Sequence, residues 1–247
     1  MKKLMSGNAA LGEAAILSGC SCYFGYPITP QNELTEYMAK RMGELGRVFI
    51  QSESEIAAIN MVLGASVAGA RAMTSSSSPG MSLKQEGISY LAADELPAVV
   101  VDMVRGGPGM GNISPAQSDY LQATRGGGHG DYKTIVLAPG SVQELTEVVP
   151  LAFDLADQYR NPVVILGDGM LGQMMEPVSF DNIKPPKEYP KDYTLTGAKG
   201  RPSRMVRSLL FDTKEEEEHN WKLVRKYQRM EQNEVRYETF LTDDAEM

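Results

Sequence analysis

The fold of this chain is decided by two short stretches, Phe24-Gly25-Tyr26-Pro27-Ile28-Thr29-Pro30 and Gln51-Ser52-Glu53-Ser54-Glu55-Ile56-Ala57-Ala58. In the first, a strand ends and the chain turns sharply into a helix. In the second, carboxylates open another helix directly after another strand. Neighbouring turns of this kind form a crevice at the carboxyl ends of a parallel sheet, which is where open α/β proteins bind ligands.

Predicted strands and helices alternate from residue 8 to residue 166. We expect strands over 21–25, 47–50, 72–75, 97–104, 134–137 and 162–166, and helices over 8–18, 30–42, 54–69, 79–93 and 141–159. Thr29 before Pro30, and Ser78 before Pro79, predict helix starts with the hydroxyl residue as N-cap and proline at the first helical position. The alternation is typical of a doubly wound parallel sheet, so the predicted fold class is α/β.

The alternation ends near residue 180, so we expect residues 1–180 to form the α/β domain. Residues 181–204 are rich in Pro, Lys and Gly and lack periodicity, which is typical of a linker or a wrapping segment. The pattern over 213–240 predicts a charged amphipathic helix. Its first turn is acidic, where the helix dipole favours negative charge.

Composition narrows the classes of function. With 247 residues, 42% hydrophobic and 23% charged, the sequence is ordinary for a globular protein, and its net charge of −8 argues against nucleic-acid binding. No apolar run approaches the roughly 20 residues that span a bilayer, and there is no signal peptide, so we expect no membrane contact and a cytoplasmic location. Cys20 and Cys22 are too few for a zinc or iron–sulfur site, so we expect packing residues, and any cluster must lie on another chain.

Glu53, Glu55 and Arg105 are the first candidates for chemistry. Acidic residues in the first turn of a helix usually serve the helix dipole and capping. At a crevice-forming turn, a desolvated carboxylate can also hold a proton or bind a heterocycle nitrogen. Arg105 ends the most apolar predicted strand, and two interpretations stay open: an ion pair with Asp102 or Asp119, or a forked grip on a substrate carboxylate.

Further motifs carry weaker signals. The glycine-rich segments 105–112 and 125–131 match neither a dinucleotide fingerprint nor a P-loop, which disfavours a nucleotide-dependent dehydrogenase and favours a long active-site loop. His129 in that loop suits structural hydrogen bonding and catalysis equally. Gly167-Asp168-Gly169 lacks the later asparagine of a Mg²⁺–diphosphate motif, so we expect no metal on this chain. The run 74–78 fits an anion site and turn or capping duty about equally well.

Five segments, taken in order, resemble the 2-oxoacid:ferredoxin oxidoreductases: 26–30, 53–58, 74–80, 105–108 and 129–131. The resemblance covers roughly residues 1–180 and is to the subunit or domain that carries the pyrimidine-binding half of a thiamine diphosphate site. It implies the thiamine diphosphate-binding fold of pyrimidine type. Residues 75–87 look most like the branched-chain (2-oxoisovalerate) type, less like the 2-oxoglutarate type, and least like the pyruvate enzymes.

The resemblance implies roles for individual residues. Glu55 matches the glutamate that contacts N1′ of the cofactor pyrimidine and promotes its imino tautomer, and Thr29 and Arg105 match positions that engage the carboxyl and carbonyl groups of a 2-oxoacid. The residues implied to bind the cofactor are Tyr26, Pro27, Ile28 and Glu55. The implied reaction is oxidative decarboxylation, with the acyl group passed to coenzyme A and electrons passed through iron–sulfur clusters to ferredoxin.

The resemblance also implies partners. A β-type subunit would hold Mg²⁺ and the diphosphate, other chains would hold the clusters, and γ-type and ferredoxin-like subunits would complete a hetero-oligomer. In the family a linker leads into a second domain, which would begin about where residues 242–247 end this sequence. We therefore expect 181–247 to be linker and charged helix, and the chain alone to be inactive. A 2-oxoglutarate- or pyruvate-type enzyme and a non-catalytic assembly scaffold are the alternative interpretations.

Overall fold

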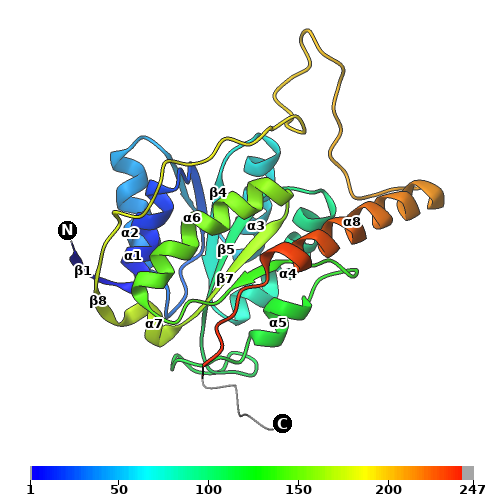
Figure 1. Ribbon diagram of the computed structural model, residues 1–247. Coiled ribbons are helices and arrows are strands. Elements are labelled where there is room, and N and C mark those ends of the chain that lie inside the picture. The colour runs from blue at the N-terminus through cyan, green and yellow to red at the C-terminus, as the bar shows by residue number, and fades with distance from the viewer. Residues whose placement is uncertain (1, 241–247) are drawn as a thin grey trace. The chain divides into compact units, whose positions relative to one another are not determined.

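The computed structural model describes residues 2–240 and confirms the α/β class (Figure 1). The strands are β1 (Lys3–Ser6), β2 (Cys22–Gly25), β3 (Val48–Gln51), β4 (Ala72–Ser76), β5 (Ala98–Val104), β6 (Ile135–Leu137), β7 (Pro162–Asp168) and β8 (Met175–Val178). The helices are α1 (Gly7–Leu17), α2 (Asn32–Glu44), α3 (Glu55–Val67), α4 (Pro79–Ala93), α5 (Tyr120–Arg125), α6 (Val142–Tyr159), α7 (Gly169–Gln173) and α8 (Thr213–Glu234).

Six of these strands form one parallel sheet in the order β3-β2-β4-β5-β7-β6. The register pairs Gly25 with Gln51 and Ser76 with Asp102. The loops that follow these strands, with their polar residues, therefore leave the sheet along the same edge. Figure 1 shows α1, α2 and α6 on one face of the sheet and α3 and α4 on the other. Helices on both faces of a parallel sheet form the predicted doubly wound arrangement.

The direction in which strands are added to the sheet reverses at β2. The chain passes from β2 through α2 to β3 on one side, and then through α3 to β4 on the other side of β2. The loops that leave β2 and β4 therefore lead to helices on opposite faces, α2 and α4. Such a switch point is where open α/β sheets bind their ligands.

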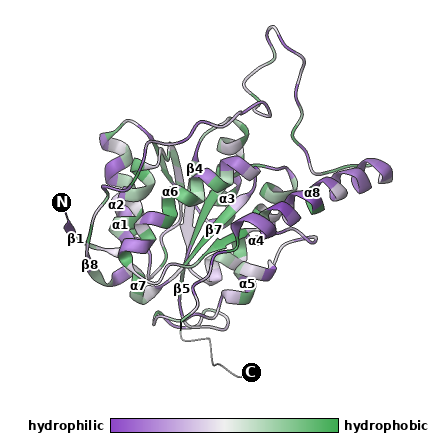
Figure 2. Cartoon of the chain, viewed as in Figure 1, coloured by the Kyte–Doolittle hydropathy of each residue, from purple (hydrophilic) through white to green (hydrophobic). Residues whose placement is uncertain are grey.

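The core lies along the central strands. All seven residues of β5 are buried, because helices cover this strand on both faces. Figure 2 shows β5 and β7 in hydrophobic colours, whereas the outward faces of the surrounding helices are largely hydrophilic. The predicted packing role of the cysteines fits the structure in part: Cys20 is buried, Cys22 is half-buried, and neither is in a disulfide. Burial raises the pKa of Cys20 to about 12.

The start of α2 differs from the prediction. The helix begins at Asn32 and not at Pro30, and Thr29 is not its N-cap, so that prediction is wrong. Gln31 holds the preceding residues in a turn: its backbone N–H donates to the Ile28 carbonyl at 3.0 Å. The turn thus extends two residues further than the Thr-Pro pattern indicated.

Two other boundaries also need correction. Ser78 precedes α4 as predicted, but its hydroxyl does not cap the helix. It accepts instead from the backbone N–H of Arg105 at 3.0 Å, because the end of β5 lies beside it. The last helix, α8, ends at Glu234 and not at 240. The next residue, Val235, takes an extended conformation, which suits a β-branched side chain. The expected approach to a second domain at 242–247 lies outside the described residues.

Four short elements are missing from the prediction: β1, β8, α5 and α7. Strands β1 and β8 pair antiparallel, with Leu4 opposite Pro177. The α7 helix begins after Asp168, whose carboxylate accepts from the Leu171 N–H at 2.9 Å, so the Gly-Asp-Gly motif serves as a helix cap. Elements this short carry too little periodicity to be recognised in a sequence.

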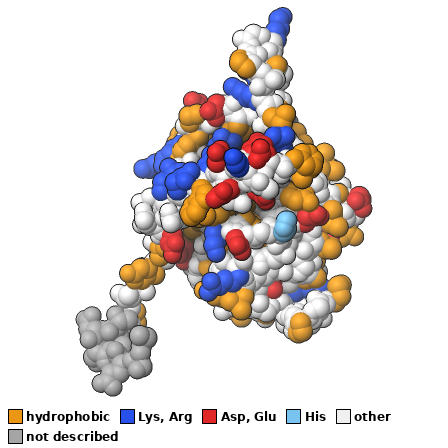
Figure 3. All heavy atoms as spheres, turned by 90° about the vertical axis from the view of Figure 1, so that its right-hand side faces the viewer, with side chains coloured by type: hydrophobic (Ala, Val, Ile, Leu, Met, Phe, Trp, Pro, Cys, Tyr) orange, Lys and Arg blue, Asp and Glu red, His pale blue; other side chains and the backbone are white. Residues whose placement is uncertain are grey.

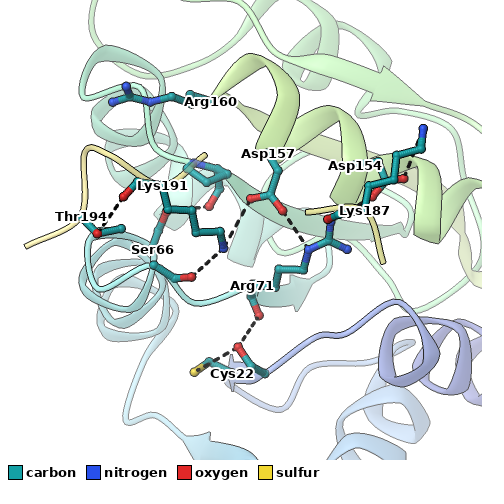
Figure 4. Close-up of polar contacts among 12 residues, drawn as sticks. Cys22, Ser66, Arg71, Asp154, Asp157, Arg160, Lys187, Lys191 and Thr194 are labelled. Carbon is teal, nitrogen blue, oxygen red and sulfur yellow. Dashed lines mark hydrogen bonds and ion pairs between the residues drawn. The ribbon is translucent and has the colours of Figure 1, made fainter. Parts of the chain in front are cut away.

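The chain divides into two compact units, one that ends at Leu209 and one that begins at Leu210 and contains α8. Within the larger unit, residues 187–195 pack on the α/β core (Figure 4). Lys191 donates to the Gly69 carbonyl at 2.6 Å, and the Leu195 N–H donates to the Val67 carbonyl at 3.0 Å. This stretch therefore wraps around the larger unit. The division at residue 180 stays a prediction.

A charged cluster anchors the wrapping stretch, as Figure 4 shows. Arg71 donates from Nε to Asp157 at 2.8 Å and from Nη2 to Asp154 at 2.9 Å. The same Nη2 donates to the Lys187 carbonyl at 3.1 Å. Arg71 thus joins β4, α6 and the wrapping stretch in a largely buried site.

Candidate functional site

The turn after β2, residues 26–30, is held by a buried network of hydroxyl and amide groups. The Gln31 amide donates to the Tyr26 carbonyl at 3.3 Å, and its Oε1 accepts from Ser75 at 2.5 Å and from Thr35 at 3.1 Å. The Ser75 hydroxyl also bonds the Tyr23 hydroxyl at 2.5 Å. This network fixes the turn against β4, so the backbone of the turn is a rigid wall of the switch point.

Glu55 opens α3 and is only 6% exposed. Helix capping does not explain this position, because the Ser54 hydroxyl is the cap and accepts from the Ala57 N–H at 3.2 Å. Glu53, by contrast, is exposed, and its carboxylate accepts from the Ser54 hydroxyl at 2.9 Å. The two predicted carboxylates therefore separate into a buried one and a solvated one.

The Glu55 carboxylate has no hydrogen-bond or ion-pair partner within residues 2–240. It lies against the start of α4: a Cβ placed on Gly80 would be 2.7 Å from Glu55 Oε1. The same Cβ would clash with Ser76 Oγ, which is itself buried and has no hydrogen-bond partner among the described residues. Glycine at position 80 thus makes room for two unsatisfied polar groups. Burial of such groups costs free energy unless a ligand satisfies them.

A positive charge lies one turn further along α4. Lys84 is fully buried, and its Nζ donates to Thr74 Oγ1 at 3.0 Å. Burial lowers the pKa of Lys84 to about 7, while attraction to the Glu55 carboxylate acts in the opposite direction. Glu55 therefore acts on the charge of Lys84 through space, and the described residues show no direct ion pair between them.

Arg105 follows β5 and is 7% exposed. Its guanidinium donates to the carbonyls of Thr29 and Met110, both at 3.0 Å, and its Nε has no partner in the part of the chain that the structure describes. Within the described part of the chain it forms no ion pair with Asp102 or Asp119, which was one of the two interpretations. A buried cation held only by carbonyl dipoles is suited to receive an anionic ligand.

Two further carboxylates, Asp102 and Asp119, are linked through Ser78 to the backbone of Arg105. Asp102 is buried in β5 and accepts from the Ser78 N–H at 3.2 Å. Burial, together with the nearby Asp119, raises the pKa of Asp102 well above its usual range. Asp119 in turn accepts from the Ser78 hydroxyl. This set ties the end of β5 to the start of α4 and to the loop before α5.

The structure brings some predicted site residues together and leaves others apart. Thr29 and Arg105 are joined by the hydrogen bond described above, and Glu55 opens the helix after the adjacent strand β3. Tyr26 and Pro27 are exposed and Ile28 is half-buried in the same turn as Thr29. His129 is exposed in the glycine-rich loop. The run 74–78 divides into partnered and unpartnered hydroxyls.

Sequence reasoning missed Gly80 and Lys84 as parts of this site. A signal for Lys84 was present: it occupies the same helical stripe as Gly80, Ile88 and Leu91, at spacings of four and seven residues. A charged residue in an otherwise buried stripe indicates a buried polar role. For Gly80 the sequence offers no such signal, because its contact with Glu55 depends on the tertiary fold.

A doubly wound α/β domain is suited to bind a ligand at its switch point, and within residues 2–240 the buried carboxylate of Glu55 has no partner there. Comparison with known proteins identifies the class of this domain. Residues 13–239 match the family described as pyruvate flavodoxin/ferredoxin oxidoreductase, thiamine diphosphate-binding. The chain belongs to this family, as its motifs predicted.

Named relatives agree with that assignment. The chain is 52% identical, over 245 residues, to the ketoisovalerate oxidoreductase subunit VorB of Methanothermobacter thermautotrophicus, covering 99% of this chain and 70% of the relative. It is 44% identical, over 194 residues, to the 2-oxoglutarate synthase subunit KorA of Methanocaldococcus jannaschii, covering 76% of this chain and 53% of the relative.

A solved structure shares the fold. It is a 2-oxoglutarate:ferredoxin oxidoreductase from Magnetococcus marinus with 2-oxoglutarate, coenzyme A and succinyl-CoA bound. The TM-score is 0.83 at 31% identity, and the match covers 96% of this chain and 46% of that chain. The present chain therefore spans less than half of the solved relative.

No helix within 2–240 is long and apolar enough to cross a bilayer. Across the same residues, no group of three or more His, Cys, Asp or Glu side chains is arranged to hold a metal ion. On the face drawn in Figure 3, basic and acidic side chains are interspersed with apolar ones.

The site fits the pyrimidine end of thiamine diphosphate. An aminopyrimidine presents ring nitrogens and an amino group, and the site offers the Glu55 carboxylate and the Ser76 hydroxyl, neither of which has a partner within residues 2–240. Gly80 lets the backbone of α4 approach both groups closely. The donor set is therefore complementary to an uncharged, hydrogen-bonding heterocycle.

Proposed function

We propose that this chain supplies the pyrimidine-binding side of the thiamine diphosphate site in a 2-oxoacid:ferredoxin oxidoreductase, with Glu55 as the residue that contacts the ring. The chain is a subunit of an enzyme of this class, as its family and relatives indicate. The observation that carries the proposal is a buried carboxylate at the switch point that lacks any partner within the described residues.

Glu55 is suited to hold a proton at a pyrimidine nitrogen. The short turn between β3 and α3 fixes its backbone, because the Ser52 N–H and hydroxyl both donate to the Gly25 carbonyl, at 2.9 and 3.1 Å. Its side chain needs no rearrangement to accept a hydrogen bond, since no competing donor occupies it. A general acid–base group placed in this way contributes typically 10²–10⁴-fold to a rate.

Arg105 and Thr29 form the substrate side of the proposed site. The Thr29 and Met110 carbonyls orient the Arg105 guanidinium, and its charge lacks a carboxylate partner in the described chain. A 2-oxoacid brings the carboxylate that this cation needs. Tyr26, Pro27 and Ile28 supply the neighbouring wall of the turn. Bound thiamine diphosphate supplies a nucleophilic carbon and takes up the electrons left when CO₂ departs.

The proposed substrate is a branched-chain 2-oxoacid, because the relative that matches nearly the whole chain is named a ketoisovalerate oxidoreductase subunit. The relatives named 2-oxoglutarate synthase subunits match a smaller part at lower identity. No feature of the described structure favours the alternative of a non-catalytic scaffold.

The proposed assembly is a hetero-oligomer in the cytoplasm, since the relatives are named as subunits. A β-type subunit would hold Mg²⁺ and the diphosphate, and γ-type and ferredoxin-like subunits would complete the assembly. The iron–sulfur clusters that pass electrons to ferredoxin would lie on chains other than this one. Coenzyme A would accept the acyl group. Exposed apolar side chains on the elements around Glu55 suit a covering protein; they are Tyr26, Ile56, Leu83, Met110 and Ile113.

The proposal is tested by Glu55→Gln in the enzyme reconstituted with its partner subunits and thiamine diphosphate. We expect a loss of 3-methyl-2-oxobutanoate oxidation of about 10²-fold or more, because the amide cannot exchange a proton with the ring. Glu53→Gln is the matched control, since it makes the same chemical change on an exposed side chain two residues away. Equal activity of Glu55→Gln and wild type would refute the role of Glu55.

A further inference from the structure

Lys84 is an unusual feature of α4 that the proposed function leaves unexplained. Its side chain is 0% exposed, although lysine is almost never fully buried unless it is paired. The hydrogen bond from its Nζ to Thr74 Oγ1, at 3.0 Å, satisfies one of the three donors of an ammonium group. A neutral hydroxyl does not compensate the charge, so the fold must gain something else from a lysine here.

The position of Lys84 relative to Glu55 follows from two parallel sets of contacts. On α4, Gly80 and Lys84 are four residues apart and share one face. On β4, Thr74 and Ser76 are two residues apart and also share one face. Gly80 lies against Ser76 and Glu55, while Lys84 bonds Thr74. Lys84 and Glu55 therefore both contact the interface between α4 and β4, at successive positions along it.

Few other charges act on this pair. Glu55 is the charged group that acts on Lys84, from α3. On β5, Asp102 pairs in register with Ser76, and Arg105 lies three residues further along. Glu86 on α4 and Glu53 before α3 are exposed. The carboxylate and the ammonium thus form a buried, long-range pair with no net charge.

We propose that Lys84 is a positioning residue for Glu55: its buried ammonium keeps the carboxylate ionised and directed toward the pyrimidine side of the site. This inference rests on the proposed function of Glu55. A buried carboxylate without a nearby cation favours its neutral form, which no longer accepts two hydrogen bonds from a ligand. The lowered pKa of Lys84, about 7, indicates that its own charge is finely balanced.

The test compares Lys84→Met, Glu55→Gln and the double variant in the reconstituted enzyme. Methionine keeps a long unbranched side chain and removes the charge. We expect the acid limb of the kcat profile of Lys84→Met to move to higher pH by about one unit, because a nearby cation lowers the pKa of a carboxylate. Lys40→Met, an exposed lysine on α2, should leave the profile in place.

A second readout does not depend on turnover. Near-ultraviolet circular dichroism follows the tautomer of the bound pyrimidine, so its pH midpoint should move in the same direction in Lys84→Met. In the Glu55→Gln background, Lys84→Met should produce no further shift. A shift of the same size in that background would show that Lys84 does not act through Glu55, and an unmoved acid limb would overturn the proposal.

Two results, an unfolded Lys84→Met variant and a fully active Glu55→Gln variant, call for a different variant or a different measurement. If Lys84→Met does not fold, Thr74→Val serves instead, because it removes the hydroxyl that anchors Nζ and keeps both charges. We expect the acid limb of its kcat profile to move in the same direction by a smaller amount, and an unmoved limb overturns the proposal. If Glu55→Gln is as active as wild type, the proposed function itself fails. The pairing is then decided by stability alone: additive effects of Lys84→Met and Glu55→Gln on the denaturation midpoint of the chain would overturn it.

Discussion

Alanine at Gly80 should lower activity much more than it lowers stability. The new Cβ would stand 2.7 Å from Glu55 Oε1 and 3.0 Å from Glu55 Cγ, and it would also meet Ser76 Oγ, so the carboxylate must move. Overpacking of this kind costs about 1–3 kcal/mol, against a gain of at most about 1 kcal/mol from replacing glycine in a helix. The net expectation is a destabilisation of roughly 0–2 kcal/mol.

The expected loss of activity is larger because the displaced group is the proposed acid–base residue. Misplacing a catalytic group by 1 Å can reduce a rate by about 10²-fold. Denaturant unfolding of the chain and steady-state oxidation of 3-methyl-2-oxobutanoate by the reconstituted enzyme measure the two effects separately.

Gly64→Ala is the matched control for this experiment. Gly64 also lies in a helix, α3, but a Cβ there meets nothing within 4 Å. Alanine at this position should stabilise the chain by about 0.5–1 kcal/mol and leave activity unchanged. If Gly80→Ala is as active as wild type, or stabilises the chain as much as Gly64→Ala does, the described contact between α4 and Glu55 is wrong.

Two further predictions concern buried charge. Arg71→Met should destabilise the chain by about 3–5 kcal/mol, because Asp154 and Asp157 lose their buried partner. The control Arg125→Met replaces an exposed arginine and should change stability by less than about 0.5 kcal/mol. Equal unfolding midpoints of the two variants in urea would contradict this prediction. Folding raises the pKa of Asp102, so between about pH 4 and that raised pKa the unfolded chain releases a proton that the folded chain retains. The free energy of unfolding of wild type should therefore fall as the pH rises through this window. Asp102→Asn should therefore gain on wild type by about 1.4 kcal/mol per pH unit in that window, and parallel pH profiles would show that Asp102 is not protonated in the fold.

Local patterns in the sequence were sufficient for the sheet. The apolar run of β5 predicted a strand buried on both faces, and the observed strand is buried at every residue. The family motifs led to Glu55 and Arg105 as site residues, whose roles stay predictions. These features were accessible because hydrophobic periodicity and motif order are encoded by adjacent residues.

Features that depend on distant residues were not accessible. The late start of α2 depends on Gln31, which is held by Ser75, a residue 44 positions away. The room beside Glu55 depends on Gly80, and the burial of Lys84 depends on its fit against Thr74. A Thr-Pro pair is a sound helix signal in isolation, and here a tertiary hydrogen-bond network outweighs it.

The glycine-rich loop after β5 is closed at its base, with consequences for how selectivity can change. The Gly106 N–H donates to the Ser114 carbonyl at 2.9 Å, and Arg105 forms a β-bridge with Pro115, so the segment between them leaves and rejoins the sheet at one point. Met110, near its tip, is 75% exposed, yet its carbonyl holds the Arg105 guanidinium. Insertions or deletions within this closed segment would change the surroundings of Arg105, the proposed oxoacid-binding residue, while the strand stays in register. Evolution can thus exchange substrates by altering a few loop residues, without rebuilding the core of the protein.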